Sequence, residues 1–181
     1  MLSYRHAFHA GNFADVFKHT LLLQLVQALR RKDKPFCVLD THAGTGRYDL
    51  HSASAAKNQE YADGIGRLWN QSALGPELSE YREQVRALNP NGELRYYPGS
   101  PRLIRTLLRP DDRLILTELH PGDYPVLKAE FASDRQTAVH HADGYAVFKA
   151  FLPPAARRGL VFIDPAFELR DEFDRLLEAV K

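Results

Sequence analysis

The feature that most constrains this sequence is a short apolar run followed by an acidic residue, because the unit occurs four times. The units are residues 36–39 before Asp40, residues 114–117 before Glu118, residues 137–139 leading to Asp143, and residues 160–163 before Asp164. Runs this short and this continuously apolar are typical of strands buried on both faces of a parallel sheet. Helical stretches separate them, so the sequence predicts a parallel α/β sheet with right-handed crossovers.

The acidic residues of these units fall where such a sheet binds its ligand, across the carboxyl ends of the strands. The turn at Gly44 and Gly46 lets the backbone approach a ligand, because glycine tolerates unusual dihedral angles and has no Cβ. Glu118 can accept hydrogen bonds from both hydroxyls of a ribose, and Asp143 can accept one from an adenine amine. The set predicts a site for an adenosine-containing ligand, although each member alone also fits a purely structural turn.

The fourth unit continues into the turn Asp164-Pro165-Ala166-Phe167, which indicates chemistry on an amine. The lone pair of an adenine amine is delocalised into the ring, so the nitrogen attacks poorly until its two protons are accepted. The carboxylate of Asp164 and the carbonyl of Pro165 can accept them, while the ring of Phe167 stacks on the base. The alternative is a turn that only ends the strand.

Length and composition limit the remaining possibilities. A chain of 181 residues is long enough for one domain with a proper core. Its apolar runs are shorter than the roughly 20 residues of a membrane span, and its N-terminus lacks the apolar core of a secretory signal. We therefore expect a soluble, cytoplasmic protein without a membrane partner. The net charge of +1 means that a phosphate-binding surface has to be local, and Cys37, the only cysteine, fits a small core side chain.

Two further regions complete the expected organisation. Residues 12–31 predict an amphipathic helix with Asn12 as its N-cap. Its expected apolar face consists of Phe13, Val16, Phe17, Leu21, Leu25 and Leu29. Residues 48–110 read as helices and loops, which predicts a helical insertion within a single domain of residues 1–181.

Several blocks of the sequence resemble the RlmJ family of 23S ribosomal RNA adenine-N6 methyltransferases. The blocks are residues 2–6, 9–12, 15, 18–19, 39–44, 94–101, 117–121, 142–144 and 157–160. The resemblance runs over the whole chain and is more specific than a general methyltransferase pattern. It implies a class I, Rossmann-like fold that uses S-adenosylmethionine (SAM) and no metal.

The resemblance also implies roles for individual residues. The SAM-binding residues that it implies are His19, His42, Ser100, Glu118, Asp143 and Gly144. Gly44 is expected to bind SAM as well, on the argument from the glycine turn given above. Asp164 is the implied catalytic acceptor, and Tyr4 matches a residue that engages the RNA. His6 and Lys18 belong to the same N-terminal block and are expected to line the target pocket. The alternative for these two is an ordinary surface position.

The sequence departs from the family pattern in two places. The second proline of the catalytic turn is Ala166 here, and the aromatic residue is Phe167 instead of the usual tyrosine. Without that proline, the turn is expected to be looser and the carbonyl of Pro165 less well aimed. The second departure is at Lys181, where family members continue with the last strands of the sheet, so we expect a sheet that lacks those strands.

Three functions remain as alternatives. The leading one is methylation of the N6 amine of an adenine in 23S rRNA that is deproteinised or locally unpaired, by a protein that is monomeric when complete. The second is the same reaction on DNA. The third is a non-catalytic remnant that binds SAM or nucleic acid, which Ala166 and the position of Lys181 favour.

Overall fold

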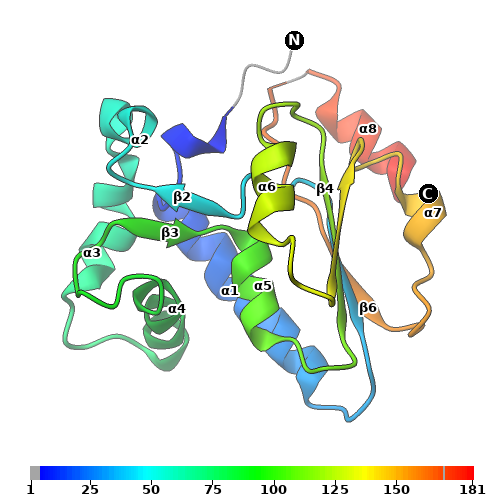
Figure 1. Cartoon of the computed structure of the whole chain (residues 1–181), viewed down its shortest axis with the longest axis horizontal. Coiled ribbons are helices and arrows are strands. Elements are labelled where there is room, and N and C mark those ends of the chain that lie inside the picture. Colours follow the sequence, from blue (N-terminus) through cyan, green and yellow to red (C-terminus); the bar gives the residue numbers. More distant parts are fainter. Residues whose placement is uncertain (1–4, 169) are drawn as a thin grey trace. The chain divides into compact units, whose positions relative to one another are not determined.

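The computed structural model describes residues 5–168 and 170–181, which divide into two compact units (Figure 1). The first unit comprises residues 29–45 and 108–181, and the second comprises residues 5–28 and 46–107. The residues of the predicted sheet all belong to the first unit. The segment predicted as a helical insertion falls mainly in the second.

The first unit is built on a four-stranded sheet in the order β5-β4-β1-β6, in which every pairing is parallel. Its strands are β1 (Cys37–Asp40), β4 (Arg113–Glu118), β5 (Thr137–His141) and β6 (Gly159–Phe162). The predicted strands and their parallel arrangement are therefore confirmed, with shifts of one or two residues at the ends. Within the described ranges, β6 pairs with β1 alone and so lies at an edge, as expected.

Helices α6 (Tyr124–Glu130), α7 (Phe148–Phe151) and α8 (Glu172–Ala179) belong to this unit (Figure 1). All four residues of β1 are buried, and Leu39 forms a core cluster with Val147 and Phe148. Burial raises the pKa of the Cys37 thiol, and the thiol is a core group as expected. Helix α8 begins at Glu172, eight residues after Asp164.

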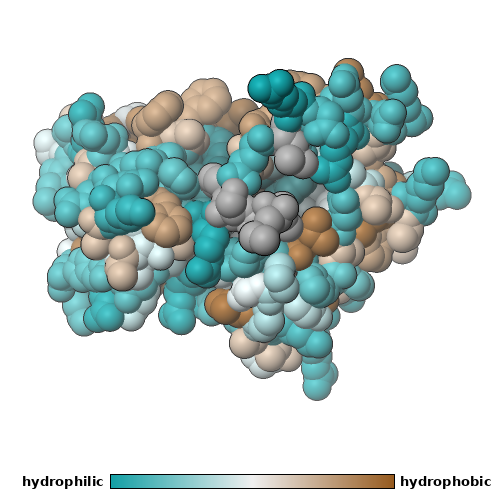
Figure 2. Space-filling model, turned by 90° about the horizontal axis from the view of Figure 1, so that it is seen from above, coloured by the Kyte–Doolittle hydropathy of each residue, from teal (hydrophilic) through white to brown (hydrophobic). Residues whose placement is uncertain are grey.

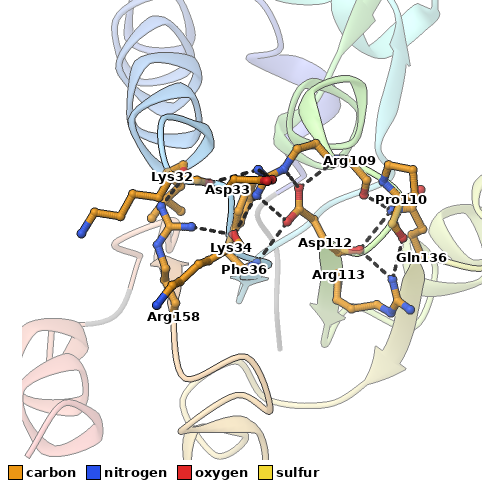
Figure 3. A network of polar contacts seen from close by, with 11 residues as sticks. Lys32, Asp33, Lys34, Phe36, Arg109, Pro110, Asp112, Arg113, Gln136 and Arg158 are labelled. Atoms are coloured by element: carbon orange, nitrogen blue, oxygen red, sulfur yellow. Dashed lines mark hydrogen bonds and ion pairs between the residues drawn. The ribbon is translucent and has the colours of Figure 1, made fainter.

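A polar network ties together the loops at the amino ends of the strands (Figure 3). The fully buried carboxylate of Asp112 accepts hydrogen bonds from the backbone N–H of Phe36, at 3.0 Å, and from Arg109. The Arg109 and Arg158 guanidinium groups both donate to the carbonyl of Lys34, at 2.8 and 2.9 Å. These charges are paired and hydrogen-bonded, so no buried charge in the network is left uncompensated. The network fixes the loops at the amino ends of the strands, opposite the carboxyl ends where the ligand site is predicted.

The second unit contains most of α1 (Phe13–Arg30) and a set of shorter helices. The others are η1 (His6–Phe8), α2 (Ala53–Asn58), η2 (Glu60–Asp63), α3 (Ile65–Trp69), α4 (Pro76–Arg86) and α5 (Ser100–Leu107). It also contains an antiparallel ribbon of β2 (Arg47–Asp49) and β3 (Tyr96–Pro98). The expectation of helices and loops alone over residues 48–110 was therefore wrong. Each strand has only three residues, which is too short for an alternating pattern to be recognised.

Helix α1 begins as predicted but buries a different face. The Asn12 side chain accepts a hydrogen bond from the backbone N–H of Asp15 at 3.0 Å, which confirms the N-cap. Four residues of the expected apolar face are exposed, namely Phe13, Phe17, Leu21 and Leu25. The buried face carries Leu22, Leu23 and Val26 together with the polar Asp15 and His19. The prediction failed because it assigned polar residues to the outside, whereas these two find polar partners in the interior.

Most side chains on the face seen in Figure 2 are hydrophilic, and hydrophobic ones form separate patches. Among the residues that the structure describes, no helix is both long and apolar enough to cross a membrane.

Candidate active site

The loop after β1 is joined by hydrogen bonds to the ends of the two neighbouring strands. The backbone N–H of Thr41 donates to the carbonyl of Phe162 on β6, and the N–H of Ala43 donates to the carbonyl of Thr117 on β4, both at 3.0 Å. The Thr117 hydroxyl returns a hydrogen bond to the Thr41 carbonyl at 2.9 Å. These hydrogen bonds hold the carboxyl ends of β1, β4 and β6 together, and we refer to this side of the sheet as its carboxyl edge.

Glu118 lies at this edge with its carboxylate already oriented. The backbone N–H of Gly44 donates to Oε2 and that of His120 donates to Oε1, each at 2.7 Å. Gly44 has φ +61°, a conformation that favours glycine. Burial raises the pKa of Glu118, although the two backbone hydrogen bonds oppose the rise. Each carboxylate oxygen can accept more than one hydrogen bond, so the group still has capacity for a pair of hydroxyls.

Gly144, after β5, lies against the loop that follows β1. A Cβ atom at Gly144 would be 2.2 Å from the Thr41 carbonyl oxygen, so a larger residue would force the two loops apart. The adjacent Asp143 accepts a hydrogen bond from the backbone N–H of Tyr145 at 2.9 Å. Its other oxygen forms an ion pair with Arg175 of α8, also at 2.9 Å. Asp143 is thus at the expected place but engaged by a residue that the sequence analysis did not select.

Helix α8 contributes Arg175 and Glu172 to a cluster of side chains at the carboxyl edge of the sheet. The guanidinium carbon of Arg175 lies 5.0 Å from the ring centroid of Tyr145, whose hydroxyl donates to Glu172 at 2.8 Å. The Tyr145 ring also meets the His42 ring edge to face, with centroids 5.3 Å apart. Burial lowers the pKa of His42, although the negative charges of Asp164, Glu172 and Asp143 oppose the shift. Glu172 and Arg175 are three residues apart and so lie on one face of α8. Nothing local in the sequence indicates what that face contacts.

The predicted catalytic turn follows β6. Asp164 is half-buried and Pro165 is buried, whereas the ring of Phe167 is 50% exposed. Phe167 has φ +52°, in the left-handed region that side chains other than glycine rarely adopt. Its ring lies 5.0 Å from that of Phe173. The aromatic group is therefore accessible, and the backbone strain lies directly after Ala166, where the family pattern has proline.

The other predicted residues lie in the second unit. His19 is buried, and its Nδ1 is 2.7 Å from the hydroxyl of Tyr97. Ser100 is also buried, at the start of α5. The structure brings His42, Gly44, Glu118, Asp143, Gly144 and Asp164–Phe167 together in the first unit, while His19 and Ser100 belong to the other. Tyr4 lies outside the described residues.

His6 and Lys18 converge on Asp15, which is fully buried. Asp15 Oδ2 accepts hydrogen bonds from His6 Nε2 at 2.9 Å and from the backbone N–H of Gly11 at 2.8 Å. The Lys18 ammonium lies 2.8 Å from Oδ1. Burial acts to raise the pKa of Asp15, but the charges of His6, His19 and Lys18 hold it well below its usual range. No local pattern in the sequence indicates that the Asp15 side chain is buried.

The strand order and the residues at the carboxyl edge define the class of fold, a Rossmann-like methyltransferase fold. The chain belongs to the family described as "Ribosomal RNA large subunit methyltransferase D, RlmJ", which matches residues 33–181.

Two curated relatives are both named "Ribosomal RNA large subunit methyltransferase J". The one from Escherichia coli (strain K12) is 52% identical over 180 residues, which cover 99% of this chain and 64% of the relative. The one from Haemophilus influenzae is 50% identical over 182 residues, covering 100% of this chain and 65% of the relative. The chain thus spans slightly less than two thirds of their length.

A solved structure is also similar, the crystal structure of protein LPL1258 from Legionella pneumophila. It shares 42% sequence identity and superposes with a TM-score of 0.88, covering 95% of this chain and 63% of that one.

Proposed function

We propose that this protein transfers a methyl group from SAM to the N6 amine of an adenine in 23S rRNA. The observation that carries the proposal is the gathering of Glu118, Asp143 and Asp164 at the carboxyl edge of one parallel sheet, with the loop after β1 held between them. The names of the curated relatives support ribosomal RNA as the substrate. Since those relatives come from bacteria, we expect the reaction in the cytoplasm.

The residues at this edge suit SAM. Glu118 is oriented by Gly44 and His120 and has capacity for the two ribose hydroxyls. Asp143 can accept a hydrogen bond from the adenine amine of SAM once it gives up its contact with Arg175. His42 and Gly144 line the same edge, and we assign His19 and Ser100 of the second unit to this ligand by family resemblance. When bound, SAM supplies an electrophilic methyl carbon.

Asp164, Pro165 and Phe167 prepare the target amine. The Asp164 carboxylate and the Pro165 carbonyl accept hydrogen bonds from the two N–H groups, which localises the nitrogen lone pair for attack. Attack on the methyl carbon would break its bond to the sulfur of SAM and leave S-adenosylhomocysteine. The methylated nitrogen would then carry one extra proton, which the Asp164 carboxylate would accept. The exposed Phe167 ring offers a stacking surface that fixes the base. These contacts strengthen as the reaction proceeds, so they act on turnover more than on binding.

The target adenine has to leave its stack to reach this turn, which favours RNA that is unpaired or stripped of ribosomal proteins. We assign Tyr4, His6 and Lys18 to the RNA, the last two oriented by Asp15.

The test is incubation with radiolabelled SAM and unmodified 23S rRNA, beside a DNA duplex and a DNA single strand of the same sequence. The proposal expects label in RNA and its loss with Asp164→Ala. Label in DNA alone would identify a DNA methyltransferase.

A specific alternative is a protein that binds SAM or RNA without turnover. The strained turn at Phe167 and the Arg175–Asp143 ion pair favour it. Binding of SAM without label transfer to either nucleic acid would support this alternative.

A further inference from the structure

The ribbon of β2 and β3 presents a cluster of side chains that takes no part in the site described above. The two strands pair with Tyr48 opposite Tyr97 and with Asp49 opposite Tyr96. Tyr48 and Tyr97 are buried. Because successive residues of a strand point to opposite faces, Arg47, Asp49 and Tyr96 occupy the other face of the ribbon.

Two guanidinium groups lie over one aromatic ring on this outer face. The Arg47 and Arg95 guanidinium carbons are 5.2 and 5.1 Å from the ring centroid of Tyr96. Arg95 also forms an ion pair with Asp49 at 3.2 Å, and about half of its side chain is exposed. Arg47 is exposed as well. The three planar groups are therefore assembled at the surface of the second unit.

The backbone beneath this cluster is fixed by the buried side chain of Asn89. Its carbonyl oxygen accepts hydrogen bonds from the N–H groups of Arg95, at 3.0 Å, and Tyr96, at 2.8 Å. Its amide nitrogen donates to the carbonyls of Tyr96 and Val85, at 2.8 and 2.9 Å. A surface held in this way loses little conformational freedom when a ligand binds.

We propose that Arg47, Arg95 and Tyr96 form a binding surface for unpaired RNA. Guanidinium planes and aromatic rings are the groups on which unstacked bases stack, and guanidinium groups also bind phosphate through paired hydrogen bonds. A chain whose net charge is only +1 has to concentrate its RNA contacts in such local clusters. The inference rests on the proposed function in taking RNA as the substrate, and it adds a contact surface away from the catalytic turn. The competing explanation is a cross-strand contact that only stabilises the ribbon.

The experiment measures binding of a fluorescent single-stranded RNA, carrying 23S rRNA sequence around a candidate adenine, by anisotropy. Arg47→Ala is expected to weaken RNA binding about tenfold, the size of one lost stacking contact. Arg47→Lys keeps the charge but removes the plane, so it is expected to weaken binding several-fold as well. The matched control is Arg67→Ala, an exposed arginine of the same unit paired with Asp63 at 2.7 Å, which should bind RNA like the parent.

Two further measurements separate binding from stability. The fluorescence of Trp69, the only tryptophan, reports whether the second unit is folded, and calorimetry with SAM reports the other site. A folded Arg47→Lys or Arg47→Ala protein that binds RNA within about twofold of the Arg67→Ala control would overturn the inference. If the parent methylates RNA but these variants bind it normally, the inference alone fails. If the parent binds no RNA, the inference and the proposed RNA substrate fail together.

Discussion

Replacement of Asp15 by asparagine is the change whose effect on stability the structure defines most clearly. The carboxylate is fully buried and meets Lys18 at 2.8 Å and His6 at 2.9 Å. An asparagine of the same shape has no charge, and its amide N–H₂ would face one of the groups that now donate to the carboxylate. Breaking a buried ion pair by removing one partner typically costs about 3 to 5 kcal/mol, because the remaining charge is left buried without compensation.

We therefore expect Asp15→Asn to lower the free energy of unfolding by about 3 kcal/mol or more, out of a total of roughly 5 to 15 kcal/mol. Urea denaturation followed by Trp69 fluorescence measures it within the same unit. The control is Asp63→Asn, which removes an exposed pair with Arg67 and should cost less than about 1 kcal/mol.

The acid dependence provides a second readout of Asp15. Because its folded-state pKa lies below the unfolded value, its stabilisation is present above the unfolded pKa and is lost as the pH falls toward the folded pKa. The parent should lose stability below about pH 4 more steeply than Asp15→Asn does. Equal stability of the two proteins at neutral pH would refute the reasoning, since the carboxylate would then contribute nothing to the fold.

Three other expectations follow from the first unit. Gly144→Ala should lower the stability by about 1 to 3 kcal/mol in a thermal melt, because the new Cβ meets the Thr41 carbonyl. The control is Gly75→Ala, whose Cβ has its nearest contact at 3.8 Å and which should lower the stability far less. The affinity for SAM, measured by calorimetry, should fall as the pH drops through the raised pKa of Glu118, because only the ionised carboxylate accepts hydrogen bonds from both ribose hydroxyls. An affinity that does not change between pH 4 and 7 would count against the contact of Glu118 with the ribose. Ala166→Pro should preserve or raise methylation, and a loss of activity would show that the turn needs the freedom that alanine provides.

The sequence predicted those parts of the fold that depend on continuous local patterns. The buried strands were recognisable because residues such as Val38 and Leu39 are apolar without interruption, and a strand buried on both faces needs no alternation. The N-cap at Asn12 was predictable for the same reason, since capping depends only on neighbouring residues.

The parts that were missed depend on contacts between distant residues. The ion pair of Asp143 with Arg175 joins residues 32 positions apart, so no local pattern indicates it. The buried face of α1 was assigned wrongly because hydrophobicity favoured Phe13 and Phe17, whereas the interior partners of Asp15 and His19 decide which side is buried.

The most direct test of the account is a single-turnover methylation assay on unmodified 23S rRNA with Asp164→Ala and Asp164→Asn beside the parent. If Asp164 accepts a hydrogen bond from the target amine, Asp164→Ala should abolish methylation while the affinity for SAM stays close to that of the parent. Asp164→Asn should keep a part of the activity, because an amide oxygen still accepts a hydrogen bond. Undiminished methylation by Asp164→Ala would contradict the account and remove residues 164–167 from the catalytic site.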